Sequence, residues 1–147
     1  MPVIYKGPAA TEQRIQQFEK NIKDKWSGRI GSDSVEVFFI PGGMKVGRGT
    51  ILVGNIVFMD SGGAGIRSFF DPNIGLLAWN VDSPDAPGHE FGHVMRNSLH
   101  YDRPHDGYEE NIMIKNTGGV EPINIYEAED AWGGMNASGF VAPPGVR

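Results

Sequence analysis

The segment His89-Glu90-Phe91-Gly92-His93 constrains the fold most strongly, because its residue types act together only on an α-helix. Residues four apart on a helix differ by about 40° around the axis and about 6 Å along it, so both imidazoles can face one metal ion. Neutral imidazole suits Zn²⁺, which with three protein ligands keeps a position for water. Glu90 lies about 100° from His89, where its carboxylate can take a proton from that water. The segment predicts hydrolysis, most simply of a peptide bond; the alternative is an amphipathic helix with exposed or structural histidines.

Length and composition exclude several classes of protein. A chain of 147 residues fits one domain, and without cysteine it has neither disulfides nor thiolate ligands, so a metal must be held by His, Asp or Glu. The net charge of -5 and the absence of a dense Lys/Arg cluster argue against nucleic acid as a partner. No stretch approaches the roughly 18 apolar residues of a membrane span, and the segment Met1 to Lys6 does not resemble a signal peptide. We therefore expect no membrane partner and no targeting signal, and the compartment stays open.

The N-terminal part of the chain predicts a linker and then a helix. Residues 1–10 contain two prolines and a glycine and are typical of a lead-in or linker, which leaves 11–147 as the single domain. Thr11 is a suitable N-cap for a helix that ends at Ser27-Gly28. Its apolar residues fall on one stripe, which indicates a helix packed on a core: Ile15, Phe18, Ile22 and Trp26.

Alternating patterns then predict strands. We expect a largely buried strand at 34–40, a β-rich run at 50–59 with a bulge at Gly54, and short strands at 66–70 and 76–80. The strand at 76–80 comes just before the metal helix, where a free edge could pair with an extended substrate. A last helix should begin at Glu121-Pro122 and turn Ile125, Ala128 and Trp132 inward. The prediction is one α+β domain: a mixed, twisted sheet of three to five strands with an N-terminal helix and an active-site helix.

The end of the active-site helix decides where a third ligand can lie. The apolar pattern stops at Arg96-Asn97, and asparagine is the best non-glycine residue for the left-handed position that ends a helix. We therefore expect the helix to turn at Asn97. His100 then follows the turn residue by three positions.

These residues resemble the metzincin class of zinc peptidases, whose pattern is H-E-x-x-H-x-x-G-x-x-H or -D followed by a Met-turn under the metal. The chain departs from it in two ways: Arg96 stands where the pattern has glycine, and His100 lies one residue further out. Downstream, Asn111-Ile112-Met113 is similar to the Met-turn. The resemblance implies a zincin fold, one Zn²⁺ ion held by His89, His93 and His100, Glu90 as general base, and Met113 as a packed floor beneath the metal.

Other residues remain candidates at this site. Asp102 and His105 compete with His100 for the third position, and Glu127 is the likeliest source of a glutamate ligand of the gluzincin type. Either Tyr101 or Tyr108 could donate a hydrogen bond to the oxyanion of a tetrahedral intermediate, against the alternative of packing in the loop.

A more specific resemblance is to the C-terminal metallopeptidase toxin domains of bacterial RHS/YD-repeat polymorphic toxins. It rests on the long first helix ending in Trp26-Ser27-Gly28, the strand before the motif, and the run from Gly107 to Met113. It implies an effector domain of a larger secreted protein, exported with that protein or by a specialised secretion system. The partners would be a protein or peptide substrate and a cognate immunity protein. The competing interpretation, suggested by Arg96 in place of glycine, is a degenerate peptidase fold that serves as a binding module.

Overall fold

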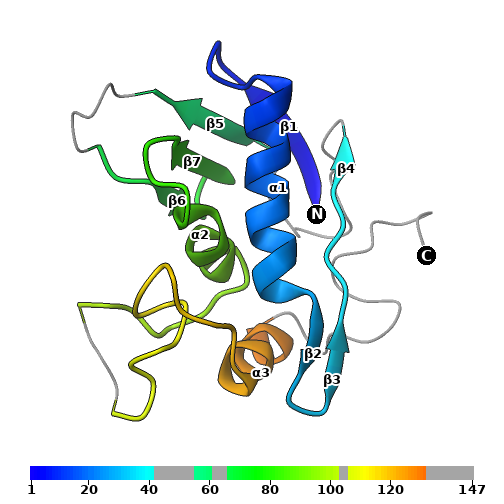
Figure 1. Ribbon diagram of the computed structural model, residues 1–147, viewed down its shortest axis with the longest axis vertical. Coiled ribbons are helices and arrows are strands. Elements are labelled where there is room, and N and C mark those ends of the chain that lie inside the picture. The colour runs from blue at the N-terminus through cyan, green and yellow to red at the C-terminus, as the bar shows by residue number, and fades with distance from the viewer. Residues whose placement is uncertain (42–54, 61–65, 103–105, 132–147) are drawn as a thin grey trace.

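A five-stranded mixed sheet and three helices form the described part of the chain in this computed structural model: residues 1–41, 55–60, 66–102 and 106–131 (Figure 1). The sheet has the order β4 (Ile40–Pro41), β1 (Pro2–Lys6), β5 (Asn55–Met59), β7 (Leu76–Asn80) and β6 (Phe69–Asp71). Its pairings are parallel except that of β6 with β7. A separate antiparallel hairpin joins β2 (Gly28–Ile30) and β3 (Asp33–Val35). The helices are α1 (Glu12–Trp26), α2 (Ala86–Val94) and α3 (Pro122–Ala131). The predicted α+β class with a mixed sheet is confirmed.

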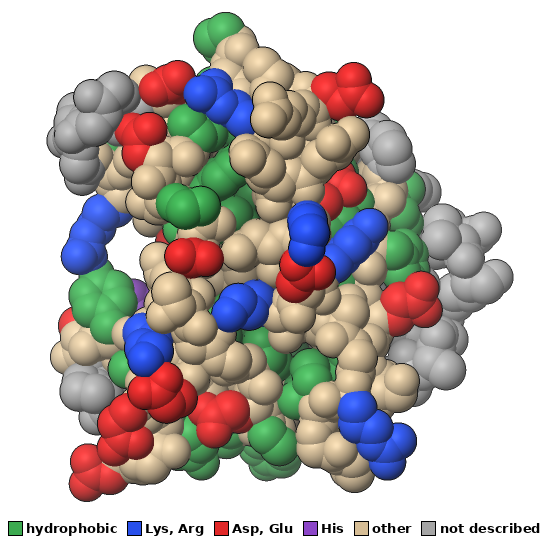
Figure 2. Space-filling view, in the orientation of Figure 1, with side chains coloured by type: hydrophobic (Ala, Val, Ile, Leu, Met, Phe, Trp, Pro, Cys, Tyr) green, Lys and Arg blue, Asp and Glu red, His purple; other side chains and the backbone are tan. Residues whose placement is uncertain are grey.

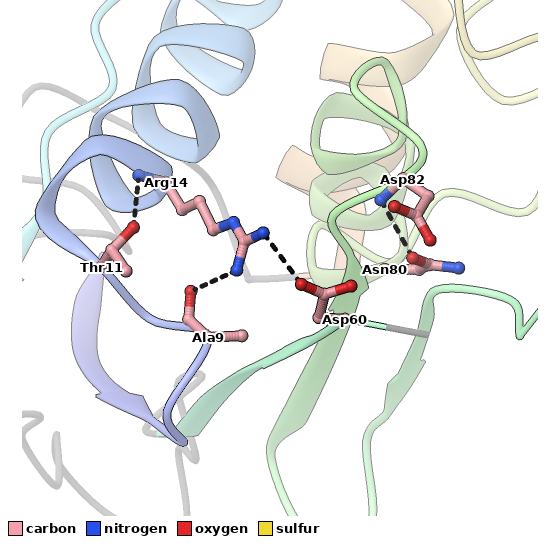
Figure 3. Close-up of polar contacts among 6 residues, drawn as sticks. All are labelled: Ala9, Thr11, Arg14, Asp60, Asn80 and Asp82. Carbon is pink, nitrogen blue, oxygen red and sulfur yellow. Dashed lines mark hydrogen bonds and ion pairs between the residues drawn. The ribbon is translucent and has the colours of Figure 1, made fainter. Parts of the chain in front are cut away.

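Helix α1 forms as the apolar stripe predicts and covers one face of the sheet (Figure 1). The Thr11 hydroxyl accepts a hydrogen bond from the Arg14 backbone N–H at 3.3 Å and caps the helix (Figure 3). The Phe18 ring lies 5.4 Å from the Phe58 ring and 5.7 Å from the Trp79 ring, so α1 packs on β5 and β7 through aromatic contacts. This packing fixes the platform on which α2 rests.

The prediction that residues 1–10 are a linker is wrong for the segment that forms β1. This strand lies inside the sheet, where it pairs with β4 on one side and β5 on the other. Val3 is buried and Tyr5 packs against the core, while Ile4 between them is exposed. The segment thus has the alternation of a half-buried strand, but over too few residues to outweigh its flanking prolines and glycine as a sequence signal.

The strand predicted at 34–40 is interrupted. β3 ends at Val35 and β4 begins at Ile40, and the residues between them adopt no strand. Val37 and Phe39 nevertheless pack against the core, and the Val37 N–H donates to the Ser27 hydroxyl at 3.2 Å. The alternation predicted which side chains face inward, but the backbone makes no strand ladder here: the Val37 N–H is bonded to a side chain, and the Phe38 carbonyl accepts from the Met1 amino group. In the next predicted run, β5 begins at Asn55, and 50–54 with Gly54 lie outside the described residues.

Two short strands precede α2: β7 lies at the predicted residues 76–80, whereas β6 is Phe69–Asp71 and not the predicted 66–70. β7 pairs with β5 along one side and with β6 along the other, so it offers no free edge to a substrate. Among the described strands β6 is at this edge of the sheet. The edge next to α2 is therefore supplied by Phe69–Asp71.

Helix α3 begins at Pro122, and its buried Ile125 and Ala128 face inward as predicted, while Trp132 lies outside the described residues. Proline at the first helical position needs no backbone N–H. None of the helices that the structure describes combines the length and apolar character needed to cross a membrane.

Candidate metal centre

Helix α2 brings His89 and His93 together as the motif requires. Their Nε2 atoms are 3.1 Å apart. Two nitrogens bound to one tetrahedral Zn²⁺ at about 2.0–2.1 Å would be separated by roughly 3.3 Å. The spacing of the two imidazoles therefore suits one ion with little rearrangement.

The Ile112 carbonyl holds His89 in the form that a metal needs. It accepts a hydrogen bond from His89 Nδ1 at 2.9 Å, which leaves Nε2 with its lone pair facing His93. Burial lowers the pKa of His89, and burial together with the neighbouring His89 and His100 lowers the pKa of His93 to about 4. Both rings are thus neutral near pH 7, as ligands must be. This role of Ile112 could not be predicted from the sequence, because a backbone carbonyl is common to every residue type.

His100 completes the cluster. His89, His93 and His100 each offer a nitrogen within 4.8 Å of the others, the one such group of His, Asp or Glu in the described part of the chain. His100 Nδ1 lies 2.6 Å from Asp102 Oδ1, which leaves Nε2 free for a metal. This carboxylate–imidazole pair is the usual support of a metal-ligating histidine. Asp102 thus contacts the third imidazole instead of joining the cluster, and His105 lies outside the described residues.

The turn after α2 differs from the prediction. The helix ends at Val94, and Arg96, not Asn97, takes the left-handed conformation, with φ of 65°. The N–H of Asn97 bonds the carbonyl of Gly92 and the N–H of Arg96 bonds that of His93, both at 3.0 Å, which is a Schellman ending. Glycine avoids the strain that a side chain meets at such a position. Arg96 nevertheless takes this conformation, at the position where the metzincin pattern has glycine. His100 follows this turn residue by four positions.

Asn97 is not the turn residue because its side chain is used in a buried amide cluster. Asn124 on α3 donates to the Asn97 and Asn111 side-chain oxygens at 2.6 and 3.2 Å, and Asn97 donates back to the Asn124 carbonyl at 3.3 Å. Asn111 accepts from the Met113 backbone N–H at 2.9 Å. The cluster ties α3 to the turn after α2 and to the Met113 segment. The amide cluster could not be predicted from the sequence, because nothing local links three asparagines so far apart in the chain.

Glu127 also ties α3 to the segment after α2, and its bonds to Ser98 together with the amide cluster form a clasp between the two. Its Oε2 accepts from the Ser98 backbone N–H at 3.1 Å and from the Ser98 hydroxyl. It is absent from the cluster of possible ligands among the described residues. The structure therefore gives no support to the alternative in which Glu127 supplies a gluzincin-type ligand. The residue instead fixes the segment that leads from the turn to His100.

Two glycines allow the Met113 segment to approach α2. Gly88 and Gly92 are one turn apart, as are His89 and His93. A Cβ at Gly88 would lie 2.9 Å from Ile112 Cδ1, and one at Gly92 would overlap Met113 Sδ. Met113 is fully buried and packs against the part of α2 that carries these glycines. The close approach is what lets the Ile112 carbonyl reach His89.

Replacing Gly92 by alanine should destabilise the protein by about 1–2 kcal/mol. Overpacking a full core costs about 1–3 kcal/mol, and the better helix propensity of alanine returns up to about 1 kcal/mol. Urea unfolding measures the change. Gly119→Ala is the matched control, because a Cβ there meets no atom within 4 Å, and it should change stability by less than about 0.5 kcal/mol. Equal stability of the two variants would contradict the close packing at Gly92.

Glu90 lies in a cleft of about 690 Å³ that is also lined by the three histidines, Phe69 of β6 and Tyr101. Figure 2 shows the surface hollowed on its left side, with a histidine side chain visible at the rim. The Glu90 side chain is 6 % exposed, and burial raises its pKa from 4.5 to about 7. A carboxyl group with this pKa exchanges protons readily near neutral pH, which suits a general base.

The buried carboxyl should also make metal-free protein less stable at high pH. Because the folded state holds the Glu90 proton more tightly than the unfolded state, its contribution is most favourable below about pH 4.5 and is lost as pH rises to about 7. The loss is on the order of 3 kcal/mol, from about 1.4 kcal/mol for each unit by which the pKa is raised. Glu90→Gln should remove this component and be the more stable protein at pH 8 in urea unfolding with a chelator present. If the free energy of unfolding had the same pH dependence in Glu90→Gln and in wild type, that result would contradict the desolvation of Glu90.

The two candidate tyrosines lie in different surroundings. Tyr101 is 43 % exposed, lines the cleft, and places its ring 4.1 Å from that of His100. Tyr108 packs partly buried against the apolar core. Only Tyr101 of this pair is thus next to the histidines.

Comparisons of the chain with protein-family models, with curated proteins and with solved structures found no match.

Proposed function

We propose that this protein is a zinc-dependent endopeptidase of metzincin-like type, with His89, His93 and His100 as ligands and Glu90 as general base. The observation that carries the proposal is the convergence of three imidazole nitrogens within 4.8 Å beside a buried carboxyl group in an open cleft. Three imidazole nitrogen donors with solvent access are a ligand set of catalytic zinc sites. A peptide is the natural substrate because the cleft runs beside the edge strand β6, to which an extended chain can add.

Zn²⁺, when bound, supplies a Lewis acid that polarises the scissile carbonyl and lowers the pKa of water. The protein's own groups do the rest. The Ile112 carbonyl and Asp102 orient the rings of His89 and His100, and their hydrogen bonds make those rings more basic donors. Glu90 takes the proton of the attacking water and delivers it to the leaving amine. Tyr101, whose ring lies 4.1 Å from that of His100, is the residue that we propose to donate to the oxyanion of the tetrahedral intermediate.

The geometry also favours a peptidase over a degenerate binding module. That alternative drew on Arg96 in place of glycine, but the turn closes with arginine and still directs His100 to the cluster. In the described part of the chain no Asp, Glu or fourth His joins the three histidines, as a closed structural site would require.

The test is a combined measurement of metal content and hydrolysis. Purified protein should bind one Zn²⁺ per chain, cleave unfolded protein substrates, lose activity with a chelator, regain it with Zn²⁺, and be inhibited by a peptide hydroxamate. Zinc binding without cleavage of any substrate and without hydroxamate binding would overturn the proposal in favour of a structural site.

A further inference from the structure

Arg67 lies on the wall of the cleft, and buried hydrogen bonds hold the backbone on both sides of it. Asn80, at the end of β7, is 3 % exposed and donates from its side-chain amide to the Ile66 carbonyl at 2.5 Å. Its backbone N–H donates to the Ser68 hydroxyl at 2.9 Å, and its side-chain oxygen accepts from the Asp82 N–H at 3.0 Å (Figure 3). Arg67 is therefore carried by a backbone segment fixed to the sheet.

The Arg67 side chain contacts Tyr101, which also lines the cleft. Its guanidinium carbon lies 4.9 Å from the centre of the Tyr101 ring, and the Tyr101 ring lies 4.1 Å from His100 and 6.5 Å from His89. A guanidinium stacked on an aromatic face keeps its N–H donors at its edges, where they can bind a carboxylate through two parallel hydrogen bonds. The positive charge thus contacts the Tyr101 ring, and that ring in turn lies beside the proposed metal ligand His100.

This charge is free for a substrate. Within the part of the chain that the structure describes, no carboxylate lies within ion-pair distance of Arg67, whereas Arg14 pairs with Asp60 at 3.0 Å. Arg96 and Asp82 also line the cleft, but both already interact with other groups of the protein. In a chain with a net charge of -5, a cation at this position stands out against a field that repels acidic substrates.

We propose that Arg67 is a specificity residue that selects peptides with a carboxylate close to the scissile bond. This inference rests on the peptidase function proposed above. The carboxylate can be an acidic side chain of the substrate or the carboxyl group at its C-terminus. Both are carboxylates and would pair with Arg67 in the same way. The expected preference for acidic peptides is opposite to the preference that the negative net charge of the protein alone would predict.

Cleavage of matched peptides tests the proposal. The series has Glu or Gln at successive positions on either side of the scissile bond, each with an amidated or a free C-terminus. Wild-type protein should cleave the best carboxylate-bearing peptide about tenfold faster in kcat/KM than its neutral partner, the size expected for one charge-assisted pair. Preference for internal Glu in amidated peptides identifies a side chain; preference for the free terminus in Gln peptides identifies the C-terminal carboxylate.

Variants then assign the preference to Arg67. Arg67→Gln should abolish it and Arg67→Glu should reverse it toward Lys-containing peptides. Arg29→Gln, which removes an exposed charge of the β2 hairpin outside the cleft, should leave it intact. A preference that survives in Arg67→Gln, or its absence in wild type, would overturn the proposal.

A binding measurement separates this inference from the proposed activity. Glu90→Gln protein should bind the Glu peptide about tenfold more tightly than the Gln peptide, and Arg67→Gln in that background should remove the difference. If no peptide is cleaved by zinc-loaded wild type, the peptidase proposal fails, while unequal binding still supports the role of Arg67. Equal binding together with normal cleavage refutes the role of Arg67 alone.

Discussion

Glu90→Gln is expected to abolish peptide hydrolysis while leaving zinc bound. Glutamine has the shape of glutamate and can occupy the same buried place, but it cannot accept the proton of an attacking water. General bases contribute about 10²–10⁴-fold to a rate, and here the same group also serves as the acid for the leaving amine, so we expect a loss at or beyond the upper end of that range. The three imidazoles do not depend on the carboxylate, since His89 bonds Ile112 and His100 bonds Asp102.

The measurement is kcat with a fluorescent peptide, alongside zinc content by elemental analysis. Glu36→Gln is the matched control, because Glu36 is exposed between β3 and β4 and should retain full activity. Hydrolysis by Glu90→Gln at the wild-type rate would show that another group activates the water. Loss of zinc along with activity would instead mean that Glu90 shapes the ligand cluster.

The elements that sequence predicted well are those with a long period or a fixed spacing. Helix α1 has a capping threonine and carries its apolar stripe over about three turns. The two motif histidines are brought together by helix geometry alone. These signals are local, so they do not depend on the rest of the fold. The cluster contains His100, although the turn residue is Arg96 and not Asn97, from which the position of His100 was predicted.

The features that sequence could not supply depend on contacts between distant segments. β1 was taken for a linker, because only its pairing with β4 and β5 reveals it as part of the sheet. Asn97 has the better intrinsic preference for the left-handed turn, yet Arg96 takes it because Asn97 is engaged by Asn124 from α3. A tertiary hydrogen bond here outweighs a local preference worth about 1 kcal/mol.

The orientation of the cluster likewise depends on partners that are remote in sequence. Ile112 contributes only its carbonyl. The carbonyl reaches His89 because the glycines at positions 88 and 92 leave no side chains between α2 and the segment of Ile112 and Met113. A backbone acceptor and an absent side chain are both invisible to motif analysis. The effector role and the immunity protein implied by the toxin resemblance concern partners outside this chain, and they remain predictions.

Removing His100 should weaken zinc binding far more than removing Asp102. Loss of an imidazole takes away one of three ligands, whereas loss of a carboxylate that only orients a ligand costs about 10- to 100-fold in affinity. We therefore expect His100→Ala to match His89→Ala in a chelator-competition titration, with both losing zinc at concentrations where Asp102→Asn still binds it. Cobalt substitution gives a second readout, since the absorption of bound Co²⁺ should persist in Asp102→Asn and disappear in His100→Ala.

The opposite ranking would move the third ligand to Asp102. In the geometry found here that outcome requires the Asp102 carboxylate to leave His100 Nδ1, a contact of 2.6 Å, and to take the place of the imidazole within the cluster. The segment between the turn and His100 is held by Glu127 at Ser98 and by Asn124 at Asn97, so such a shift would have to break hydrogen bonds to α3. A variant that loosens this clasp, Glu127→Ala, should therefore reduce zinc affinity without touching a ligand. Asp102→Asn combined with Glu127→Ala would show whether the two act on the same imidazole, because losses through one shared group do not add.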